Sequence, residues 1–367
     1  MHRVPSPPSN QEFNLLSSLS RLTFTRFIAA LMVVAFHFGS GFYPFNDGNL
    51  AGLFLQGPKA VEYFFLLSGF VLSAVYASDN PLRFNYAKFL LARFARIYPV
   101  FFLGLLFAYC LETPKDIVLL LNVTLTQAWS SDYAISMNNP GWSLSVEMFF
   151  YLTFPLLLLI LTKKRLPIAI AICFVSYMAL EYGPLYVILL DDQPHLSKIA
   201  HALLGPYFPI RNLPLFMIGA TLGASVKFGL ITPKILSLFK FPAIYIALLF
   251  AWLYYALPFT AAIFCLLILS LIQSKGPISN FFSGKVGVFL GESSYSLYIL
   301  HYPLYIWYFN LIQPLYDAPE TLKFYLYIIL LLASSMLTFV IIETPCRKAI
   351  RWLGEAGQLK PKKQRAY

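Results

Sequence analysis

Apolar runs of about 20 residues recur from one end of this 367-residue chain to the other. A run of that length is what an α-helix needs to cross the hydrocarbon core of a bilayer. Hydrophobic residues make up 59% of the chain and charged residues only 12%, which is too little polar surface for a soluble domain of this size. Backbone amides inside a bilayer must be paired within the protein, and such runs satisfy this only as helices. The sequence therefore predicts an all-α, polytopic transmembrane helical bundle.

The apolar runs predict ten membrane helices, and the charged residues predict their orientation. With a cytoplasmic N-terminus, most of the 27 Lys and Arg residues fall in cytoplasmic segments, as the positive-inside rule requires. Both termini are then cytoplasmic, and the net charge of +11 is explained by topology and not by binding to nucleic acid. The expected helices are 22–42, 59–77, 90–110, 144–162, 166–190, 208–226, 241–256, 258–273, 288–312 and 322–342.

One membrane domain is expected over residues 21–346. It lies between a polar N-terminal tail, residues 1–20, and a basic C-terminal tail, residues 347–367, which could contact anionic membrane lipids. The apolar stretch 117–129 is too short to cross a bilayer, so we expect an interfacial or re-entrant segment on the outer side. The four cysteines are scattered without metal-ligand spacing, so we expect neither disulfides nor a metal site.

Two ionisable residues, Arg26 and His37, lie inside the first predicted membrane helix. Such residues are costly within a bilayer and most often mark a functional site. Eleven residues rotate an α-helix by about 1100°, so the two side chains lie within about 20° of one face and about 16 Å apart along the axis. The structural alternatives are a neutral imidazole hydrogen-bonded inside the bundle and an arginine that extends to lipid phosphate.

Glu147 is harder to explain by structure alone. It lies about two turns into an apolar helix that begins near Trp142, where an unpaired carboxylate would be costly, so we expect a cationic partner. A pair with His37 would orient the imidazole and stabilise its protonated form, as general-base catalysis requires. Trp142 itself suits the membrane interface.

Three further polar residues in membrane helices have simple structural explanations. Glu62 is a helix-start carboxylate that can pair with Lys59. Ser68 and Gly69 together indicate a surface for close helix packing. His301, which precedes a proline by two residues, can be a structural histidine beside a helix kink.

Arg93 and Arg96 present two guanidinium groups on one helix face at the cytoplasmic membrane surface. Guanidinium groups match the geometry of phosphate. The pair is therefore either an ordinary basic anchor or a phosphate site for an anionic cytoplasmic cofactor, and the residues alone do not decide between them.

Taken in order, these segments resemble the acyltransferase-3 family of integral-membrane O-acyltransferases, which includes O-antigen acetylases. Each match alone is short, but six in the family's order span nearly the whole chain. The matching stretches are Arg26-x10-His37, Phe64-Phe-Leu-Leu-Ser-Gly-Phe70, Arg93-x-x-Arg96-Ile-Tyr-Pro99, Trp142-Ser-Leu-Ser-Val-Glu147, Ser294-Tyr-Ser-Leu-Tyr-Ile-Leu-His301-Tyr-Pro303 and Glu343-Thr-Pro345-x-Arg347.

The resemblance implies transfer of an acyl group, commonly acetyl, from cytoplasmic acyl-CoA to a glycan or lipid-linked sugar outside the bacterial inner membrane. His37 matches the family's essential histidine, Arg26 its partner, and Glu62 a position that is usually acidic. The phosphates of CoA would bind Arg93 and Arg96, with Arg26 reaching the same region. No permanently bound cofactor and no metal are implied. Many relatives carry an extracytoplasmic hydrolase-like domain, and the sequence suggests the stand-alone form.

We expect His37 to act as the general base, with Glu147 or Glu62 stabilising the imidazolium; a second form of the mechanism has His37 carry the acyl group. The main alternative is a proton-coupled secondary transporter that uses Arg26, His37 and Glu147. It predicts inverted repeats with paired broken helices, which the sequence does not show. A membrane acyltransferase of an unrelated class would make His301 the central residue, and a non-catalytic receptor would leave the intramembrane charges unexplained.

Overall fold

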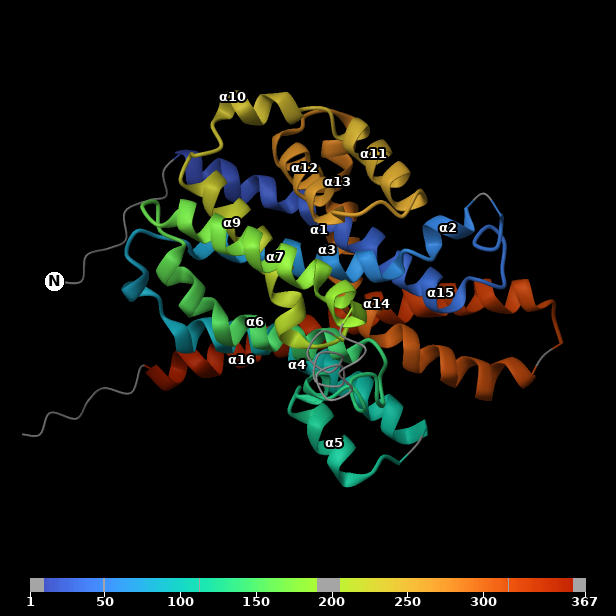
Figure 1. Ribbon diagram of the computed structural model, residues 1–367. Helices are drawn as coiled ribbons and strands as arrows, with labels where there is room; N and C mark the ends of the chain where they lie inside the picture. Colours follow the sequence, from blue (N-terminus) through green and yellow to red (C-terminus); the bar gives the residue numbers. More distant parts are fainter. Residues whose placement is uncertain (1–9, 49, 112, 190–204, 316, 359–367) are drawn as a thin grey trace, which may run out of the picture.

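The computed structural model describes residues 10–48, 50–111, 113–189, 205–315 and 317–358, and these residues form a bundle of helices without a strand (Figure 1). The long helices run side by side along one direction, and α1 lies between α3 and α14, with which it makes extensive contacts. The all-α fold predicted from the apolar runs is confirmed.

The helices follow one another with short connections. The longer ones are α1 (Asn10–Phe38), α3 (Gly57–Tyr76), α4 (Tyr86–Leu111), α6 (Gly141–Ile160), α7 (Leu166–Leu189), α9 (Pro209–Lys227), α11 (Pro242–Tyr254), α12 (Thr260–Gln273), α14 (Lys285–Trp307), α15 (Glu320–Thr338) and α16 (Thr344–Gln358). The shorter ones are α2 (Ala51–Phe54), α5 (Asp116–Val123), α10 (Pro233–Leu236) and α13 (Pro277–Ser283).

The ten predicted ranges each overlap one long helix in order, from α1 to α15. Within the described residues, five helices are long and apolar enough to cross a membrane, or up to seven spans if each bent helix pair counts as one. An integral membrane bundle is therefore supported, whereas ten spans and cytoplasmic termini stay predictions. Helices also extend into both predicted tails, because α1 begins at Asn10 and α16 ends at Gln358.

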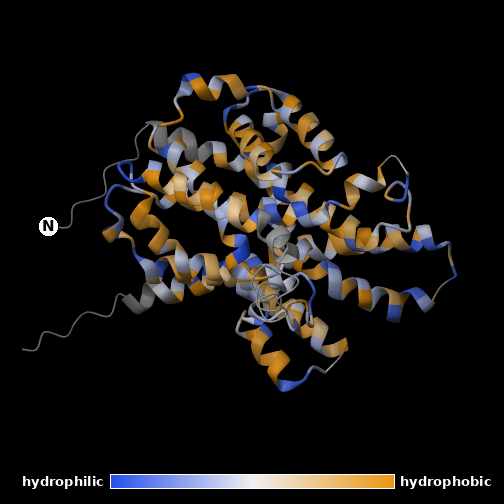
Figure 2. Ribbon diagram, in the orientation of Figure 1, coloured by the Kyte–Doolittle hydropathy of each residue, from blue (hydrophilic) through white to orange (hydrophobic). Residues whose placement is uncertain are grey.

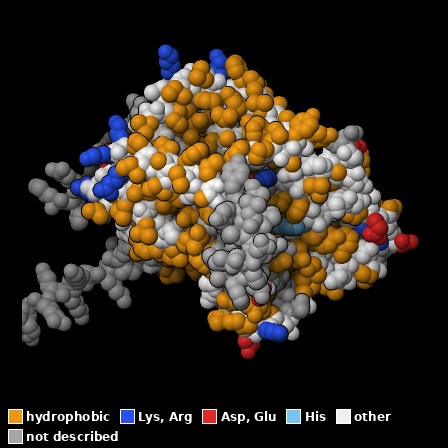
Figure 3. All heavy atoms as spheres, in the orientation of Figure 1, with side chains coloured by type: hydrophobic (Ala, Val, Ile, Leu, Met, Phe, Trp, Pro, Cys, Tyr) orange, Lys and Arg blue, Asp and Glu red, His pale blue; other side chains and the backbone are white. Residues whose placement is uncertain are grey.

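The molecule has one end that is rich in Lys and Arg, here called the basic end. It includes the connections 77–85 and 161–165, the end of α9 and part of α16. Lys163 N donates a hydrogen bond to Asp79 Oδ1 at 2.8 Å, and Lys227 Nζ donates to the Val75 carbonyl at 2.7 Å, which ties these connections together. On the face that Figure 3 shows, hydrophobic side chains cover most of the surface between this end and the far one, and Figure 2 shows that the helices there consist mainly of hydrophobic residues.

The chain between α4 and α6 carries two short helical segments. α5 has eight residues, which is too few to cross a bilayer, and a 3₁₀ turn, Gln127–Trp129, follows it. Asn122 and Gln127 are fully buried there, and the Gln127 amide donates to the Gly141 carbonyl at 3.0 Å. The segment thus packs onto the start of α6 as a short helical cap, consistent with the expected non-spanning segment.

Glycines set the closest helix contacts. A Cβ added at Gly69 of α3 would lie 2.0 Å from the Phe216 carbonyl oxygen of α9, and one added at Gly219 would lie 1.8 Å from the Leu66 carbonyl oxygen. The small-residue surface expected at Gly69 is therefore used for packing. In the same way, a Cβ at Gly291 of α14 would lie 2.1 Å from a carbonyl oxygen of α1, at Thr23.

Two helix pairs are sharply bent. The segment Pro233–Phe239 meets α11 at 61°, and α12 meets α13 at 90°. A secondary transporter would place broken helices around its substrate site. Neither bent pair contributes to the polar cavity described below, among the residues that the structure describes.

We expect Gly219→Ala to destabilise the protein, because the new methyl group cannot fit unless α3 and α9 move apart. Overpacking of this kind costs about 1–3 kcal/mol. The apparent melting temperature in detergent should fall. Gly41→Ala is the matched control, since a Cβ there meets no atom within 4 Å, and equal stability of the two variants would contradict the close contact.

Candidate functional site

Two histidines from distant parts of the chain form a hydrogen-bonded pair, here called the histidine dyad. His37 lies in the last turn of α1, and His301 lies in α14. His37 Nδ1 and His301 Nε2 are 2.9 Å apart, and the two rings lie edge to edge and nearly coplanar, with centroids 5.1 Å apart and planes 13° apart. His301 is fully buried, whereas His37 is partly exposed. The dyad therefore has one ring that a substrate could approach.

His301 is held on both its ring and its backbone. Its Nδ1 lies 2.5 Å from the carbonyl oxygen of Tyr298, one turn earlier in α14. The hydroxyl of Tyr327, on α15, donates to the His301 carbonyl at 2.8 Å. Contacts from two helices thus fix the position of His301.

Pro303 lies two residues after His301, inside α14. Pro303 has no N–H, so the carbonyl of Ile299 four residues earlier loses its helical partner. The side-chain amide of Asn138, in the connection before α6, donates to this carbonyl at 3.1 Å. Asn138 is fully buried. The Asn138 amide therefore replaces the backbone hydrogen bond that Pro303 removes beside the dyad.

A second polar site lies deeper in the bundle. It is a cavity of about 70 Å³, here called the central cavity, at the meeting of α1, α3, α4, α6 and α14. Its polar lining residues are Arg26, Ser68, Arg96, Ser143, Glu147, Glu292, Ser294, Tyr295 and Tyr298. Four of the candidate site residues therefore meet in one place, namely Arg26, Arg96, Glu147 and Ser68, the last of which was a possible additional site residue.

Glu147 is stabilised by groups other than His37. Its Oε1 accepts hydrogen bonds from Ser68 Oγ at 3.2 Å and from the Tyr151 hydroxyl. Arg26 and Arg96 supply nearby positive charge, which is the cationic compensation that the sequence required. The expected contact between Glu147 and His37 is not formed in the described structure.

Glu62 also lies away from the dyad. Its carboxylate pairs with Lys59 at 2.8 Å, as its place at the start of α3 suggested. It lines a separate small pocket with Glu181 and Arg211. Neither expected carboxylate thus contacts His37, and His301 takes that place.

Further charges surround the cavity from the side of α16. Glu292 lies 3.4 Å from an Arg347 guanidinium nitrogen, and Ser296 Oγ donates to Glu343 Oε2 at 2.9 Å. Glu343 is buried in the π-helical segment that links α15 to α16. Because α1, α4, α6, α14 and α16 all contribute charges, each is compensated only in the assembled bundle.

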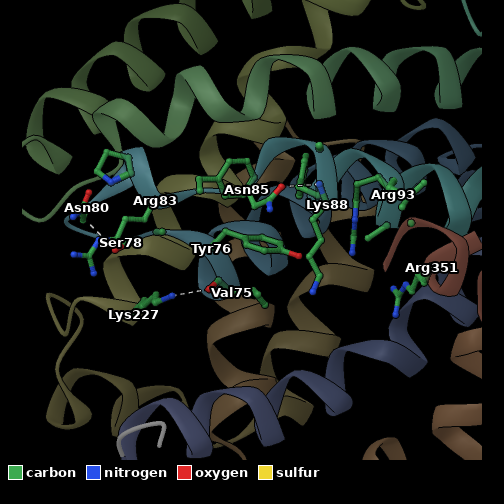
Figure 4. A pocket seen from close by; sticks show the side chains of 18 residues that line it. Val75, Tyr76, Ser78, Asn80, Arg83, Asn85, Lys88, Arg93, Lys227 and Arg351 are labelled. Atoms are coloured by element: carbon green, nitrogen blue, oxygen red, sulfur yellow. Dashed lines mark hydrogen bonds between the residues drawn. The ribbon is translucent and has the colours of Figure 1, made fainter. Parts of the chain in front are cut away.

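At the basic end lies a much larger pocket of about 820 Å³, here called the basic cleft. It lies between the α3–α4 connection, α4, the end of α9 and α16 (Figure 4). Five cations line it, namely Arg83, Lys88, Arg93, Lys227 and Arg351, and no carboxylate is among its described lining residues. Tyr76 and Phe89 contribute aromatic surface. The size falls within the range of small-molecule sites, about 300–1,000 Å³.

Arg93 and Arg96 therefore line different spaces. Residues three apart on a helix are rotated by about 60° from one another, and in this bundle that rotation separates the basic cleft from the central cavity. Arg93 packs over the Phe89 ring at 5.8 Å, and its buried Nε has no hydrogen-bond partner. Of the two arginines that were expected at the basic end of α4, only Arg93 lines the basic cleft.

The described residues add groups that sequence reasoning missed. Arg83, Lys88, Lys227 and Arg351 come from four separate segments, so no local pattern could group them. Glu292 lies seven residues after the start of α14 and only nine before His301, a spacing that could have indicated a second charged site on that helix.

Trp142, at the start of α6, directly precedes Ser143, which lines the central cavity. Its ring packs against Tyr207 with centroids 5.0 Å apart. The next residue, Ser143, hydrogen-bonds the Tyr298 hydroxyl at 2.9 Å, and Tyr298 also supports His301. Trp142 is thus next in sequence to a residue that bonds Tyr298, which in turn bonds His301.

The chain belongs to the acyltransferase-3 family, because the family model, described as "Acyltransferase domain", matches residues 19–343. It is 38% identical to "Acyltransferase MdmB" of Streptomyces mycarofaciens over 154 residues, which cover 38% of each protein. It is 22% identical to "O-acetyltransferase OatA" of Staphylococcus aureus (strain NCTC 8325 / PS 47) over 342 residues, 83% of this chain and 54% of OatA. The chain thus spans about half or less of these relatives. No solved structure matches it.

We expect Asn138→Leu to destabilise the bundle, because it leaves the Ile299 carbonyl unpaired beside Pro303. An unsatisfied buried polar group costs about 1–3 kcal/mol. Combining it with Pro303→Ala should recover part of this loss, since an N–H at position 303 can donate to the same carbonyl. Thermal unfolding of the two single variants and the double variant tests this. Strictly additive effects would contradict the compensation.

Proposed function

We propose that this protein is a membrane O-acyltransferase that moves an acyl group, commonly acetyl, from acyl-CoA to a hydroxyl of a glycan or lipid-linked sugar. The observation that carries the proposal is the order of the sites. The basic cleft, the central cavity and the histidine dyad follow one another from the basic end toward the opposite end. An anionic donor and an acceptor could therefore approach from different sides of the membrane.

The basic cleft suits the nucleotide part of acyl-CoA. Five cations without a lining carboxylate favour a polyanion such as the phosphates of CoA. Tyr76 and Phe89 offer apolar surface for a base. The positive-inside rule puts this end in the cytoplasm, where acyl-CoA is made, and we assign the protein to the bacterial inner membrane.

The pantetheine arm would extend from the cleft toward the dyad. Arg93 lines the cleft and Arg96 lines the central cavity, so α4 borders both spaces. From Glu292 to His301, α14 rises about 13 Å along the same route. In this arrangement Arg26 and Arg96 contact the arm or the acyl group inside the bundle, and Arg93 contacts phosphate.

The reaction requires one base. A ring nitrogen of His37 takes the proton from the acceptor hydroxyl while its oxygen attacks the thioester carbon. The new C–O bond forms, the C–S bond breaks, and the thiolate of CoA takes the proton from the His37 imidazolium. The products are the O-acyl ester and CoA. General-base help of this kind contributes about 10²–10⁴-fold to the rate.

The other expected site residues take revised roles in this proposal. Glu147 lies in the central cavity, where it accepts a hydrogen bond from Ser68 and compensates the charges of Arg26 and Arg96. It is therefore not assigned to His37. Glu62 supports the outer end of α3 through Lys59. Trp142, with Tyr207, offers an aromatic surface near the dyad for the apolar face of a sugar.

We expect His37→Ala to abolish acylation of the acceptor while the protein inserts and accumulates normally. The reason is that the partly exposed ring of the dyad is lost. Mass spectrometry of surface glycans and glycolipids from cells with wild-type or variant protein measures the effect. Unchanged acylation in cells that carry His37→Ala would refute the proposed role of His37.

We expect Lys88→Ala combined with Arg351→Ala to weaken acetyl-CoA binding by the detergent-purified protein. A hydrogen bond to a charged group contributes about 1.5–3 kcal/mol, and about 1.4 kcal/mol is tenfold in Kd, so each loss should cost about tenfold or more. Lys163→Ala combined with Lys164→Ala removes the same charge at the same end outside the cleft. Equal effects of the two pairs would remove the cleft from the donor site.

A further inference from the structure

We propose that His301 is a positioning residue that holds the proton of neutral His37 on Nδ1 and so leaves the Nε2 lone pair of His37 as the base. This inference rests on the proposed function, in which His37 removes a proton from the acceptor. It adds which nitrogen does so and which residue decides it.

The argument begins at the far side of His301. Its Nδ1 lies 2.5 Å from the Tyr298 carbonyl oxygen. A carbonyl oxygen accepts hydrogen bonds and cannot donate them, so Nδ1 of His301 must carry a proton. Of the two neutral tautomers of His301, only the one protonated at Nδ1 makes this bond.

The proton on Nδ1 decides the state of the other ring nitrogen. Neutral His301 then has a lone pair on Nε2, the atom that lies 2.9 Å from His37 Nδ1. Two lone pairs at this distance would repel, so His37 Nδ1 must donate. A neutral imidazole has one N–H, and with the proton of His37 on Nδ1 its Nε2 is unprotonated.

The unprotonated nitrogen of His37 is the available one. His37 is partly exposed, and no described residue hydrogen-bonds to its Nε2. The rings of Phe36 and Tyr302 pack near His37 at centroid distances of 5.2 and 6.2 Å. An incoming hydroxyl therefore meets a lone pair within an aromatic surround.

The dyad differs from a catalytic pair with a carboxylate. Within the described residues neither ring contacts Asp or Glu, so a neutral acceptor orients the base. When His37 takes up the substrate proton, its Nδ1–H becomes a charged donor to His301 Nε2. Hydrogen bonds of this kind are about twice as strong as neutral ones. His301 thus stabilises the imidazolium without a buried negative charge beside it.

His301 can do this because it is immobile. It is fully buried, its carbonyl accepts from the Tyr327 hydroxyl at 2.8 Å, and its Nδ1 bonds the Tyr298 carbonyl. Rotation of the ring would break the bonds to Tyr298 and His37 together. The tautomer of His37 is therefore set by the packing of α14 and α15.

Two substitutions separate a tautomer effect from a packing effect. In His301→Gln the amide oxygen can still accept from His37 Nδ1, whereas His301→Leu offers no acceptor. We expect His301→Leu to lower kcat by about 10- to 100-fold, the loss that is typical when the hydrogen-bond partner of a metal-bound histidine is removed. The KM values for acyl-CoA and acceptor should change little, and His301→Gln should recover much of kcat. Equal losses in both variants, or wild-type kcat in His301→Leu, would overturn the inference.

A second measurement does not depend on turnover or on the stability of a variant. Nitrogen NMR of wild-type protein labelled with ¹⁵N-histidine reports which ring nitrogens carry protons. The His37 signals are those missing from His37→Ala. We expect a protonated Nδ1 and an unprotonated Nε2, and the reverse would overturn the inference. Acyl transfer is measured separately, so absence of transfer by the wild-type protein would refute the proposed function while the NMR result still judged the tautomer.

Discussion

The structure depends on placing ionisable side chains inside an apolar bundle without leaving them uncompensated. An isolated charge in a medium of low dielectric constant is strongly disfavoured. Here Arg26, Arg96, Glu147 and Glu292 come from four helices and meet at one cavity. The same requirement explains the hydroxyl groups of Ser68 and Tyr151 beside Glu147. Helix packing and the polar interior are therefore one problem, because neither is satisfied unless α1, α4, α6 and α14 are assembled.

Much of the fold followed from the sequence, because length and hydrophobicity are local properties. Each apolar run of about 20 residues became a helix in the expected place. The expectation that Arg26 and His37 share a face also agrees with the structure, since Arg26 lines the cavity with α14 and His37 bonds to α14. Helical periodicity alone supports such a statement.

The contacts within the site could not be predicted in the same way. His37 and His301 are 264 positions apart, and which helices are neighbours is decided by close contacts such as the one at Gly291. Glu147 was expected beside His37, but the 16 Å or so between Arg26 and His37 along α1 left two possible depths. Glu147 lies at the depth of Arg26. The separation of Arg93 from Arg96 likewise depends on what packs against a rotation of about 60°.

The separation of the basic cleft from the dyad would limit which acyl donors can react. In the function that we propose, the central cavity of about 70 Å³, lined by charged and hydroxyl side chains, lies between these two sites. A donor bound by its phosphates in the basic cleft would deliver its acyl group to the dyad only if a flexible arm joins its phosphates to its acyl group. Small activated acids that lack such an arm would bind at one end and fall short at the other. Selectivity for the donor would then come from reach as much as from chemical recognition.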